Sequence, residues 1–374
     1  MENNEIKSLN DYKDEIHRCS KCGLCQAVCP LYQSTGNECS VSRGQFIMLD
    51  GVVREKLDFS KTINKYLDMC LKCNKCSDFC PSQIEVVDIL LCAKREYLKN
   101  RGKFERFLYS VLESKIIFNT ILNILKSITK VFTPKVKSKH FETKAVYFGG
   151  CISALKPDID NYVIKLLNDI NIEVINTNFN CCGIPFLTTG NIERFVENLK
   201  ENVNKVPQDA QMLITDCASC EWAWREYIKY IDDDTLKERL INLKIVSIYE
   251  LIDKNELCFR AKNKAKLTYH KPCHEKHSEN ILNIIRNIKN CEYVELDGMD
   301  ECCGFSSFEH PYTLKDTKPV REKKKKSVMG CSADYVLTTC VGCLFSLNLL
   351  TPDKHKNRLI SFLKNNCEFD KTKK

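Results

Sequence analysis

Residues 19–30 read CSKCGLCQAVCP and residues 70–81 read CLKCNKCSDFCP, and these two stretches decide the fold of the first part of the chain. In each, four cysteines follow the spacing C-x2-C-x2-C-x3-C and a proline comes next. This spacing holds [4Fe–4S] clusters, and the fourth cysteine of each run ligates the other cluster. The runs therefore predict two crossed ligand sets: Cys19, Cys22, Cys25 and Cys80 for one cluster, and Cys70, Cys73, Cys76 and Cys29 for the other. Zinc is the alternative for four thiolates, but two full copies of this spacing favour iron and sulfur.

Forty residues separate Cys29 from Cys70, and their apolar positions recur at helical spacing. Phe46, Leu49 and Val53 illustrate the pattern. A helical insert between the two runs favours an α-helical dicluster ferredoxin over the compact β-hairpin type.

The rest of the chain contains one cysteine pattern twice: a lone cysteine, then Cys-Cys-Gly, then C-x2-C. The first set is Cys151, Cys181, Cys182, Cys217 and Cys220, and the second is Cys273, Cys302, Cys303, Cys340 and Cys343. Matching cysteines are 121 to 123 residues apart. So constant an offset indicates an internal duplication.

Each copy also alternates short β-rich runs with helical patterns. The predicted strands are 145–148 and 212–215 in the first copy and 267–269 and 335–338 in the second, and the predicted helices include 161–170 and 281–288. This alternation predicts a mainly parallel α/β sheet in each copy. Four of the cysteines directly follow predicted strands, where sites in such sheets assemble.

Adjacent cysteines cannot comfortably ligate one metal ion, but they can ligate different irons of a larger cluster. Gly183 and Gly304 lack a Cβ, so the backbone can turn sharply or approach an inorganic core there. Zinc held by four of the five thiolates remains the alternative for either set.

Residues 104–132 show the apolar spacing of a long amphipathic helix, and residues 133–143 are polar and predict a linker. The longest uncharged stretch, 116–125, is too short for a membrane span, which needs about 20 residues. We expect this helix to pack on its own protein, with a membrane surface or a partner as the alternative. The predicted organisation is 1–100 (dicluster ferredoxin), 101–143 (helix and linker), 144–262 (first cysteine-rich domain) and 263–374 (second).

With all eighteen of these cysteines present, the chain resembles the CCG-domain iron–sulfur oxidoreductases, which include the glycolate oxidase iron–sulfur subunit and the heterodisulfide reductase catalytic subunit. The resemblance implies an α+β multidomain fold, with an α-helical dicluster ferredoxin followed by two duplicated α/β CCG domains. It also implies a non-cubane [4Fe–4S] cluster in one or both cysteine-rich sets, beyond the two ferredoxin clusters, with zinc in one set as the alternative. The sequence YHKPCH at 269–274 resembles the family's YHDPCH, with Lys271 in place of aspartate.

Two histidines flank Cys273 in this motif. His270 and His274 could each donate a hydrogen bond to a cluster sulfur or a proton to a thiolate. For His274, capping a helix or satisfying backbone groups is an equal alternative.

Composition limits the class of protein. A net charge of +8, spread over many lysines, does not form the basic stripe of a nucleic-acid binder. The polar first residues contain no signal-peptide pattern, so we expect a cytoplasmic protein. The basic run 321–326 predicts a solvated helix face, with a docking patch as the alternative. The cysteines outside the sets are expected to be buried apolar residues: Cys39, Cys92, Cys258, Cys291, Cys331 and Cys367.

These patterns predict electron transfer. The chain has no G-x-G-x-x-G fingerprint, so hydride chemistry on glycolate or lactate must lie on a partner flavoprotein that carries FAD. The expected acceptor is a membrane quinone, a cytochrome or another carrier, which allows a peripheral position at the inner face of the membrane. A disulfide-reducing enzyme is the second hypothesis, and a zinc-bearing interaction module is the third. The sequence names no catalytic residue.

Overall fold

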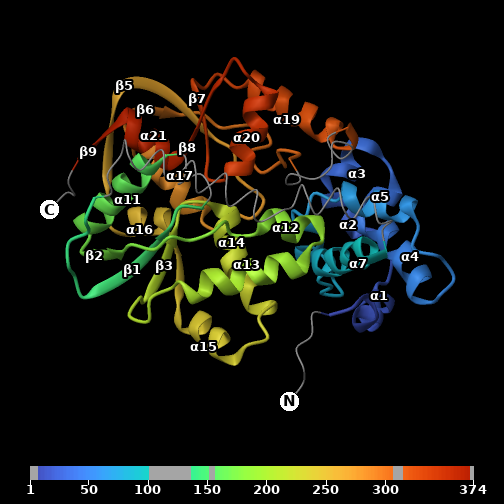
Figure 1. Cartoon of the computed structure of the whole chain (residues 1–374). Helices are drawn as coiled ribbons and strands as arrows, with labels where there is room; N and C mark the ends of the chain where they lie inside the picture. The colour runs from blue at the N-terminus through green and yellow to red at the C-terminus, as the bar shows by residue number, and fades with distance from the viewer. Residues whose placement is uncertain (1–6, 101–135, 151–155, 306–314, 371–374) are drawn as a thin grey trace. The chain divides into compact units, whose positions relative to one another are not determined.

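The computed structural model describes residues 7–100, 136–150, 156–305 and 315–370 (Figure 1). The chain divides into two compact units. Unit 1 consists of the described residues within 1–112, 183–195 and 301–326, and unit 2 consists of those within 113–182, 196–300 and 327–374.

Unit 1 is helical in its N-terminal part. Its elements there are η1 (Leu9–Tyr12), α1 (Lys13–Arg18), α2 (Leu24–Val28), α3 (Pro30–Thr35), η2 (Glu38–Ser40), α4 (Ser42–Val53), α5 (Lys61–Met69), α6 (Lys75–Asp78) and α7 (Val86–Asn100). Ser60 caps α5, because its side chain accepts a hydrogen bond from the Ile63 backbone N–H. The apolar faces of α4, α5 and α7 meet in one core, which includes Phe46, Leu67 and Leu90. The predicted helical insert is thus confirmed by α4 and α5.

Each cysteine-rich copy contains a sheet with the same strand order. The first sheet is entirely parallel, in the order β2 (Ile172–Ile175), β1 (Thr143–Phe148), β3 (Met212–Thr215) and β4 (Lys244–Ser247). The second repeats this order as β6 (Lys289–Tyr293), β5 (Cys258–Tyr269), β7 (Tyr335–Thr338) and β8 (His355–Arg358), and β9 (Cys367–Asp370) pairs antiparallel with the start of β5. The predicted α+β fold with two parallel-sheet copies is confirmed, and the equal strand orders agree with the duplication.

Helices connect the strands. They are α11 (Pro157–Asp169), α12 (Ile184–Thr189), α13 (Ile192–Asn204), α14 (Ala218–Glu226), η3 (Tyr227–Lys229), α15 (Asp234–Asn242), α16 (Ile248–Lys254), α17 (Ser278–Arg286), α19 (Lys318–Gly330), α20 (Val341–Leu350) and α21 (Leu359–Asn366). In unit 2, one apolar core contains side chains of both copies, among them Val163, Ile252, Leu267 and Phe362. The two copies therefore share one hydrophobic core.

A buried ion pair also joins the copies within unit 2. Arg358, at the end of β8, contacts the carboxylate of Asp216, and both side chains are at most 3% exposed. The guanidinium also donates to the Asp216 carbonyl at 3.3 Å. Burial raises the pKa of Asp216, while the neighbouring guanidinium acts in the opposite direction. Because Asp216 directly precedes Cys217, this pair supports one cysteine loop.

Several predictions need correction or lie outside the described ranges. The predicted helix over 104–132 falls within 101–135, which the structure does not describe. Across the described ranges, no helix combines the length and apolar content needed to cross a bilayer. The basic run 321–326 is not a uniformly solvated face, because Lys324 is 0% exposed. Of the six cysteines expected to be buried, Cys92 and Cys367 are, but Cys39, Cys258, Cys291 and Cys331 are only half-buried.

Candidate iron–sulfur centres

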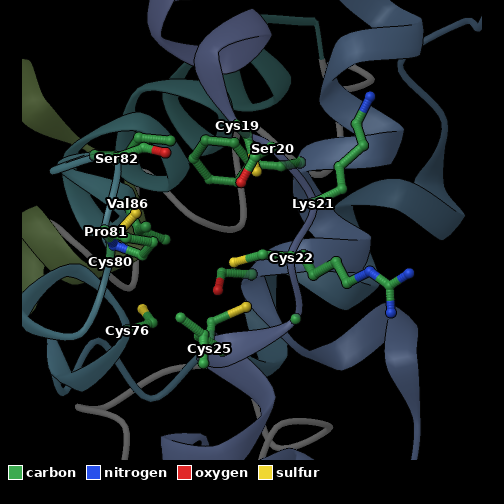
Figure 2. A pocket seen from close by; sticks show the side chains of 16 residues that line it. Cys19, Ser20, Lys21, Cys22, Cys25, Cys76, Cys80, Pro81, Ser82 and Val86 are labelled. Atoms are coloured by element: carbon green, nitrogen blue, oxygen red, sulfur yellow. The ribbon is translucent and has the colours of Figure 1, made fainter.

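A cavity of about 430 Å³ in unit 1 contains the first group of cysteines (Figure 2). Cys19, Cys22 and Cys25 line it from the first run, and Cys76 and Cys80 line it from the second. Gly23 has a φ of 87° at the start of α2, a backbone conformation in which a side chain would be strained. This turn lets three thiols of one short segment face the same cavity.

A second cavity of about 400 Å³ lies in the same unit. Cys70, Cys73 and Cys76 line it from the second run, and Cys29 lines it from the first. Each cavity thus combines cysteines of both runs, as a crossed ligand arrangement requires. The assignment of individual ligands to clusters stays a prediction.

The electrostatics of these thiols indicate what the cavities can hold. Burial raises the pKa of Cys29 to about 11. Burial, followed by the neighbouring Cys70 and Cys73, raises the pKa of Cys76 well above its usual value. Thiols packed this closely resist ionisation together unless a cation compensates them. Iron binding would supply that compensation, so the residues present fit a metal–sulfur core.

The first cysteine-rich set lies at the carboxyl ends of strands in unit 2. Its members Cys181, Cys182, Cys217 and Cys220 are buried, and Cys151 lies outside the described residues. Cys217 follows β3 and is the N-cap residue of α14, so the helix dipole favours thiolates there. The Cys220 thiol donates hydrogen bonds to Cys182 and Cys217, and these bonds, together with burial, raise the pKa of Cys220 well above its usual value.

Buried polar side chains hold the backbone of the first Cys-Cys pair. Asn198 and Asn202 donate to the Cys181 carbonyl at 2.5 and 2.8 Å. The Tyr227 hydroxyl donates to the Cys182 carbonyl at 2.7 Å. All three side chains are at most 2% exposed, so these bonds fix the loop geometry. The sequence does not reveal this support, because only the fold shows which positions of α13 and η3 face the loop.

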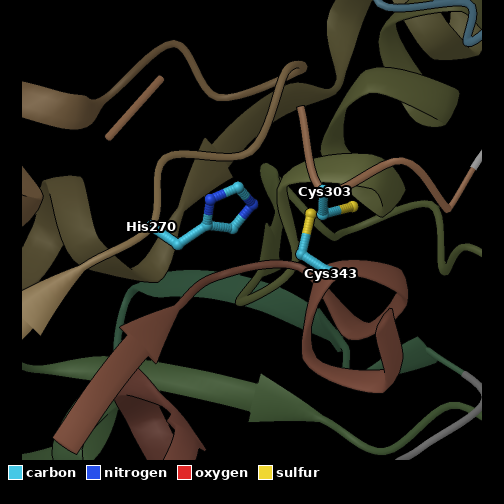
Figure 3. Close-up of side chains that lie close together, drawn as sticks. All are labelled: His270, Cys303 and Cys343. Carbon is cyan, nitrogen blue, oxygen red and sulfur yellow. The ribbon is translucent and has the colours of Figure 1, made fainter. Parts of the chain in front are cut away.

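In the second set, Cys302, Cys303, Cys340 and Cys343 are buried, whereas Cys273 is exposed. Figure 3 shows His270 and Cys343, which both belong to unit 2 and whose ligand atoms lie within 4.8 Å of one another. His270 is 1% exposed. A buried imidazole beside the Cys343 thiol agrees with the expected role of His270 near a metal core, which remains a prediction.

The two C-x2-C segments lie side by side within unit 2. Ser219 Oγ is 3.0 Å from Cys340 Sγ, and the Ala218 backbone N–H donates to the Thr339 carbonyl at 3.1 Å. Hydrogen bonds from Cys217 and then Cys343 hold the pKa of Cys340 well below its usual value, despite burial. One thiol of the first copy thus contacts one thiol of the second.

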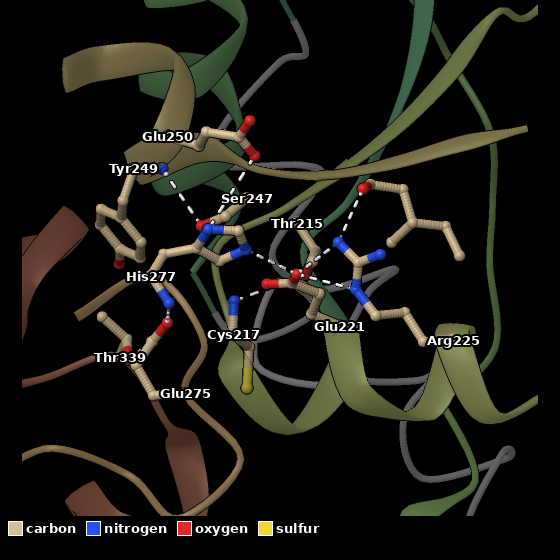
Figure 4. A network of polar contacts seen from close by, with 11 residues as sticks. Thr215, Cys217, Glu221, Arg225, Ser247, Tyr249, Glu250, Glu275, His277 and Thr339 are labelled. Atoms are coloured by element: carbon tan, nitrogen blue, oxygen red, sulfur yellow. Dashed lines mark hydrogen bonds and ion pairs between the residues drawn. The ribbon is translucent and has the colours of Figure 1, made fainter. Parts of the chain in front are cut away.

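A polar network surrounds this junction (Figure 4). His277 Nε2 is 2.8 Å from Glu221 Oε1, which also binds Arg225 at 2.8 Å. On the other side, the His277 backbone N–H donates to Glu275 at 2.7 Å, and the Thr339 hydroxyl donates to the same carboxylate at 2.6 Å. Glu221 directly follows Cys220 and Thr339 directly precedes Cys340, but nothing in the sequence spacing marked these residues as a network.

His274 has a partner that neither sequence-based alternative included. Its ring stacks on Trp222 of α14, with centroids 4.3 Å apart and an interplanar angle of 15°. This stack joins the Cys273 loop to the helix that carries Cys220.

The Glu221–His277 pair predicts a pH dependence of stability. The hydrogen bond to Glu221 raises the pKa of His277 above 6.5. The contribution of protonated His277 to the free energy of unfolding is therefore complete below pH 6.5, and it is lost as the pH rises through the pKa of His277 in the folded protein. Burial alone would raise the pKa of Glu221, but His277 and Arg225 outweigh it and hold that pKa below 4.5. The carboxylate's contribution is therefore complete above pH 4.5 and is lost at lower pH. We expect the pair to contribute most between pH 4.5 and 6.5.

Urea unfolding of the cluster-loaded protein at a series of pH values checks this expectation. The wild type should lose stability from pH 6.5 upward relative to His277→Gln, which has no titrating ring at this position. Parallel curves for the two proteins would contradict it. His355→Gln, at an exposed histidine on β8, is the matched control.

Comparison with known proteins agrees with this architecture. The family model described as a 4Fe-4S dicluster domain matches residues 15–84, and the model described as a cysteine-rich domain (CCG) matches residues 145–225 and 267–348. An uncharacterized iron–sulfur protein of Methanococcus maripaludis is 24% identical, over 92% of this chain and 70% of its own length. The glycolate oxidase iron-sulfur subunit of Escherichia coli is 23% identical over 88% of both chains. One component of the dihydromethanophenazine:CoB–CoM heterodisulfide reductase of Methanosarcina acetivorans is 23% identical over 88% of this chain and 87% of its own.

Proposed function

Because the chain belongs to the iron–sulfur proteins that join a 4Fe–4S dicluster domain to two cysteine-rich CCG domains, we propose that it is an electron-transfer subunit. Its complex would be a flavin-dependent 2-hydroxy-acid dehydrogenase of glycolate or lactate type. Relatives named as glycolate oxidase iron-sulfur subunits and lactate utilization protein A support this substrate class. The observation that carries the proposal is the pair of cavities in unit 1, each lined by cysteines of both runs.

Cysteines would hold every centre. One [4Fe–4S] cluster is assigned to Cys19, Cys22, Cys25 and Cys80, and the other to Cys70, Cys73, Cys76 and Cys29. The two CCG sets would hold one or two further clusters of non-cubane type, with zinc in one set as the alternative. When bound, such clusters supply one-electron carriers.

The chain's own residues would orient and insulate these centres. Asn198, Asn202 and Tyr227 hold the first Cys-Cys backbone, and the Asp216–Arg358 pair holds the loop before Cys217. Since the chain has no dinucleotide-binding fingerprint, oxidation of the hydroxy acid belongs to an FAD-bearing partner. A quinone, a cytochrome or another carrier would take the electrons, and the location would be cytoplasmic or peripheral at the inner face of the membrane.

Affinity purification of the tagged chain from its source organism without oxygen tests this function. We expect a copurifying flavoprotein, and reduction of both its flavin and the clusters when glycolate or lactate is added. The variant Cys22→Ala should still bind the flavoprotein but should transfer fewer electrons. A complex without flavin would contradict the proposal.

A disulfide-reducing enzyme is the second candidate, and the contact between the two C-x2-C segments favours it. Ser219 and Cys217 of the first copy both contact Cys340 of the second, so two cysteine-rich sets adjoin one another. Such a pair of centres could supply the two electrons that, with two protons, convert one disulfide into two thiols. Electron paramagnetic resonance spectra of the oxidised protein with added thiols distinguish the candidates, because only a disulfide reductase should show altered cluster signals.

A further inference from the structure

Lys324 is a buried cation beside the second Cys-Cys-Gly segment. It is 0% exposed although it lies within the most basic stretch of the chain, and its neighbours Lys323, Lys325 and Lys326 are exposed. An ammonium group removed from water costs several kcal/mol unless negative charge compensates it. A thiolate-bound metal core at the neighbouring Cys-Cys-Gly segment would supply such a charge.

The face of α19 that carries Lys324 packs on the second Cys-Cys-Gly segment within unit 1. Val320, one turn earlier, shares an apolar cluster with Cys302. Arg321 adjoins Gly304, where a Cβ would lie only 2.4 Å from Arg321 Cγ. Because side chains on a helix lean toward its N-terminus, Lys324 is expected to lean over this turn. Lys324 thus belongs to the face of α19 that adjoins this Cys-Cys-Gly segment.

In the first copy, the described residues place no cation at the corresponding position. The offset of 121 to 123 residues between the copies matches Lys324 with positions 201–203 of α13, where the buried residues Asn202 and Val203 are uncharged. Asn202 donates a neutral hydrogen bond to the Cys181 carbonyl instead. The two cysteine-rich sets therefore differ in charge at this position although their cysteine patterns are the same.

We propose that Lys324 is a positioning residue that raises the reduction potential of the second CCG centre above that of the first. This inference rests on the proposed function, since it requires an iron–sulfur centre in the second set. A cluster bound by thiolates becomes more negative on reduction, and a nearby fixed positive charge stabilises that state. The protonated Lys324 side chain would make the second set the preferred electron acceptor of the two.

Redox titration followed by electron paramagnetic resonance tests this role without any substrate. Cys182→Ser and Cys343→Ser identify which signal belongs to which set. In Lys324→Met, we expect the potential of the second centre to move to a more negative value while the first centre and the dicluster centres keep theirs. Lys324→Arg should retain the wild-type potential. Lys325→Met, at an exposed lysine of the same helix, is the matched control for net charge and should shift nothing.

The outcomes separate the two proposals. An unshifted second centre in Lys324→Met, or an equal shift in Lys325→Met, would refute the role of Lys324 and leave the proposed function intact. A second set that contains zinc and shows no redox signal would refute both the redox role of that set and the inference. If Lys324→Met loses the dicluster signals through misfolding, the uncharged polar variant Lys324→Gln replaces it under the same criteria.

Discussion

Cys22→Ala and Cys80→Ala are expected to remove the same iron–sulfur cluster, with the loss of about four iron atoms per chain in each variant. The two residues lie 58 positions apart in sequence, yet both line one cavity in unit 1. Loss of either thiolate leaves one iron of that cluster without its protein ligand. Iron analysis and electron paramagnetic resonance of anaerobically prepared protein measure the effect.

Variants of the second ligand set test whether each cluster takes its cysteines from both runs. Cys29→Ala and Cys73→Ala should both remove the other cluster and leave the first signal in place, because these residues line the second cavity. Cys92→Ala is the control, since this buried cysteine of α7 belongs to no set and should leave both signals unchanged. If Cys80→Ala removed the same signal as Cys73→Ala, each run would instead hold its own cluster.

Arg358→Leu is expected to lower the free energy of unfolding by about 3–5 kcal/mol, because it leaves the Asp216 carboxylate buried without a partner. Urea unfolding of the cluster-loaded protein measures the loss. Adding Asp216→Leu to this variant should recover much of it, since removal of both charges leaves neither uncompensated.

The surface pair Lys144–Asp209 provides the matched control. Its N–O distance is 2.7 Å, but both side chains are solvated, with exposures of 36% and 56%. Lys144→Leu should therefore leave the unfolding midpoint nearly unchanged, because solvent screens such pairs. Equal midpoints for Arg358→Leu and the wild type would show that the buried pair contributes nothing.

Local sequence patterns predicted the parts of this protein that depend on local spacing. The cysteine runs predicted that thiols of both runs would come together, although Cys76, which was predicted for one cluster, lines both cavities. The strands after which Cys217 and Cys340 lie were predicted at their observed positions. These features need only turns and strand ends, which the adjacent residues determine.

Features that depend on contacts distant in sequence were not predicted. Asp216 and Arg358 are 142 residues apart, so no window of sequence contains both. Lys324 lies in a run of charged residues whose pattern predicts a solvated helix face. Only the packing of α19 shows that this lysine is buried. The stack of His274 on Trp222 likewise requires the two copies to fold together.

Strand β5 has a consequence for how the protein is made. Its first residues, Cys258–Ala261, pair with β9 near the end of the chain, whereas the first sheet closes with β4 at Ser247. On the ribosome, the earlier sheet can form while the later half is still being translated, because its pairings are complete. The edge of β5 must wait until β9 emerges from the exit tunnel. Nascent chains stalled before residue 367 would therefore carry an unpaired strand edge, the kind of surface that chaperones shield from aggregation.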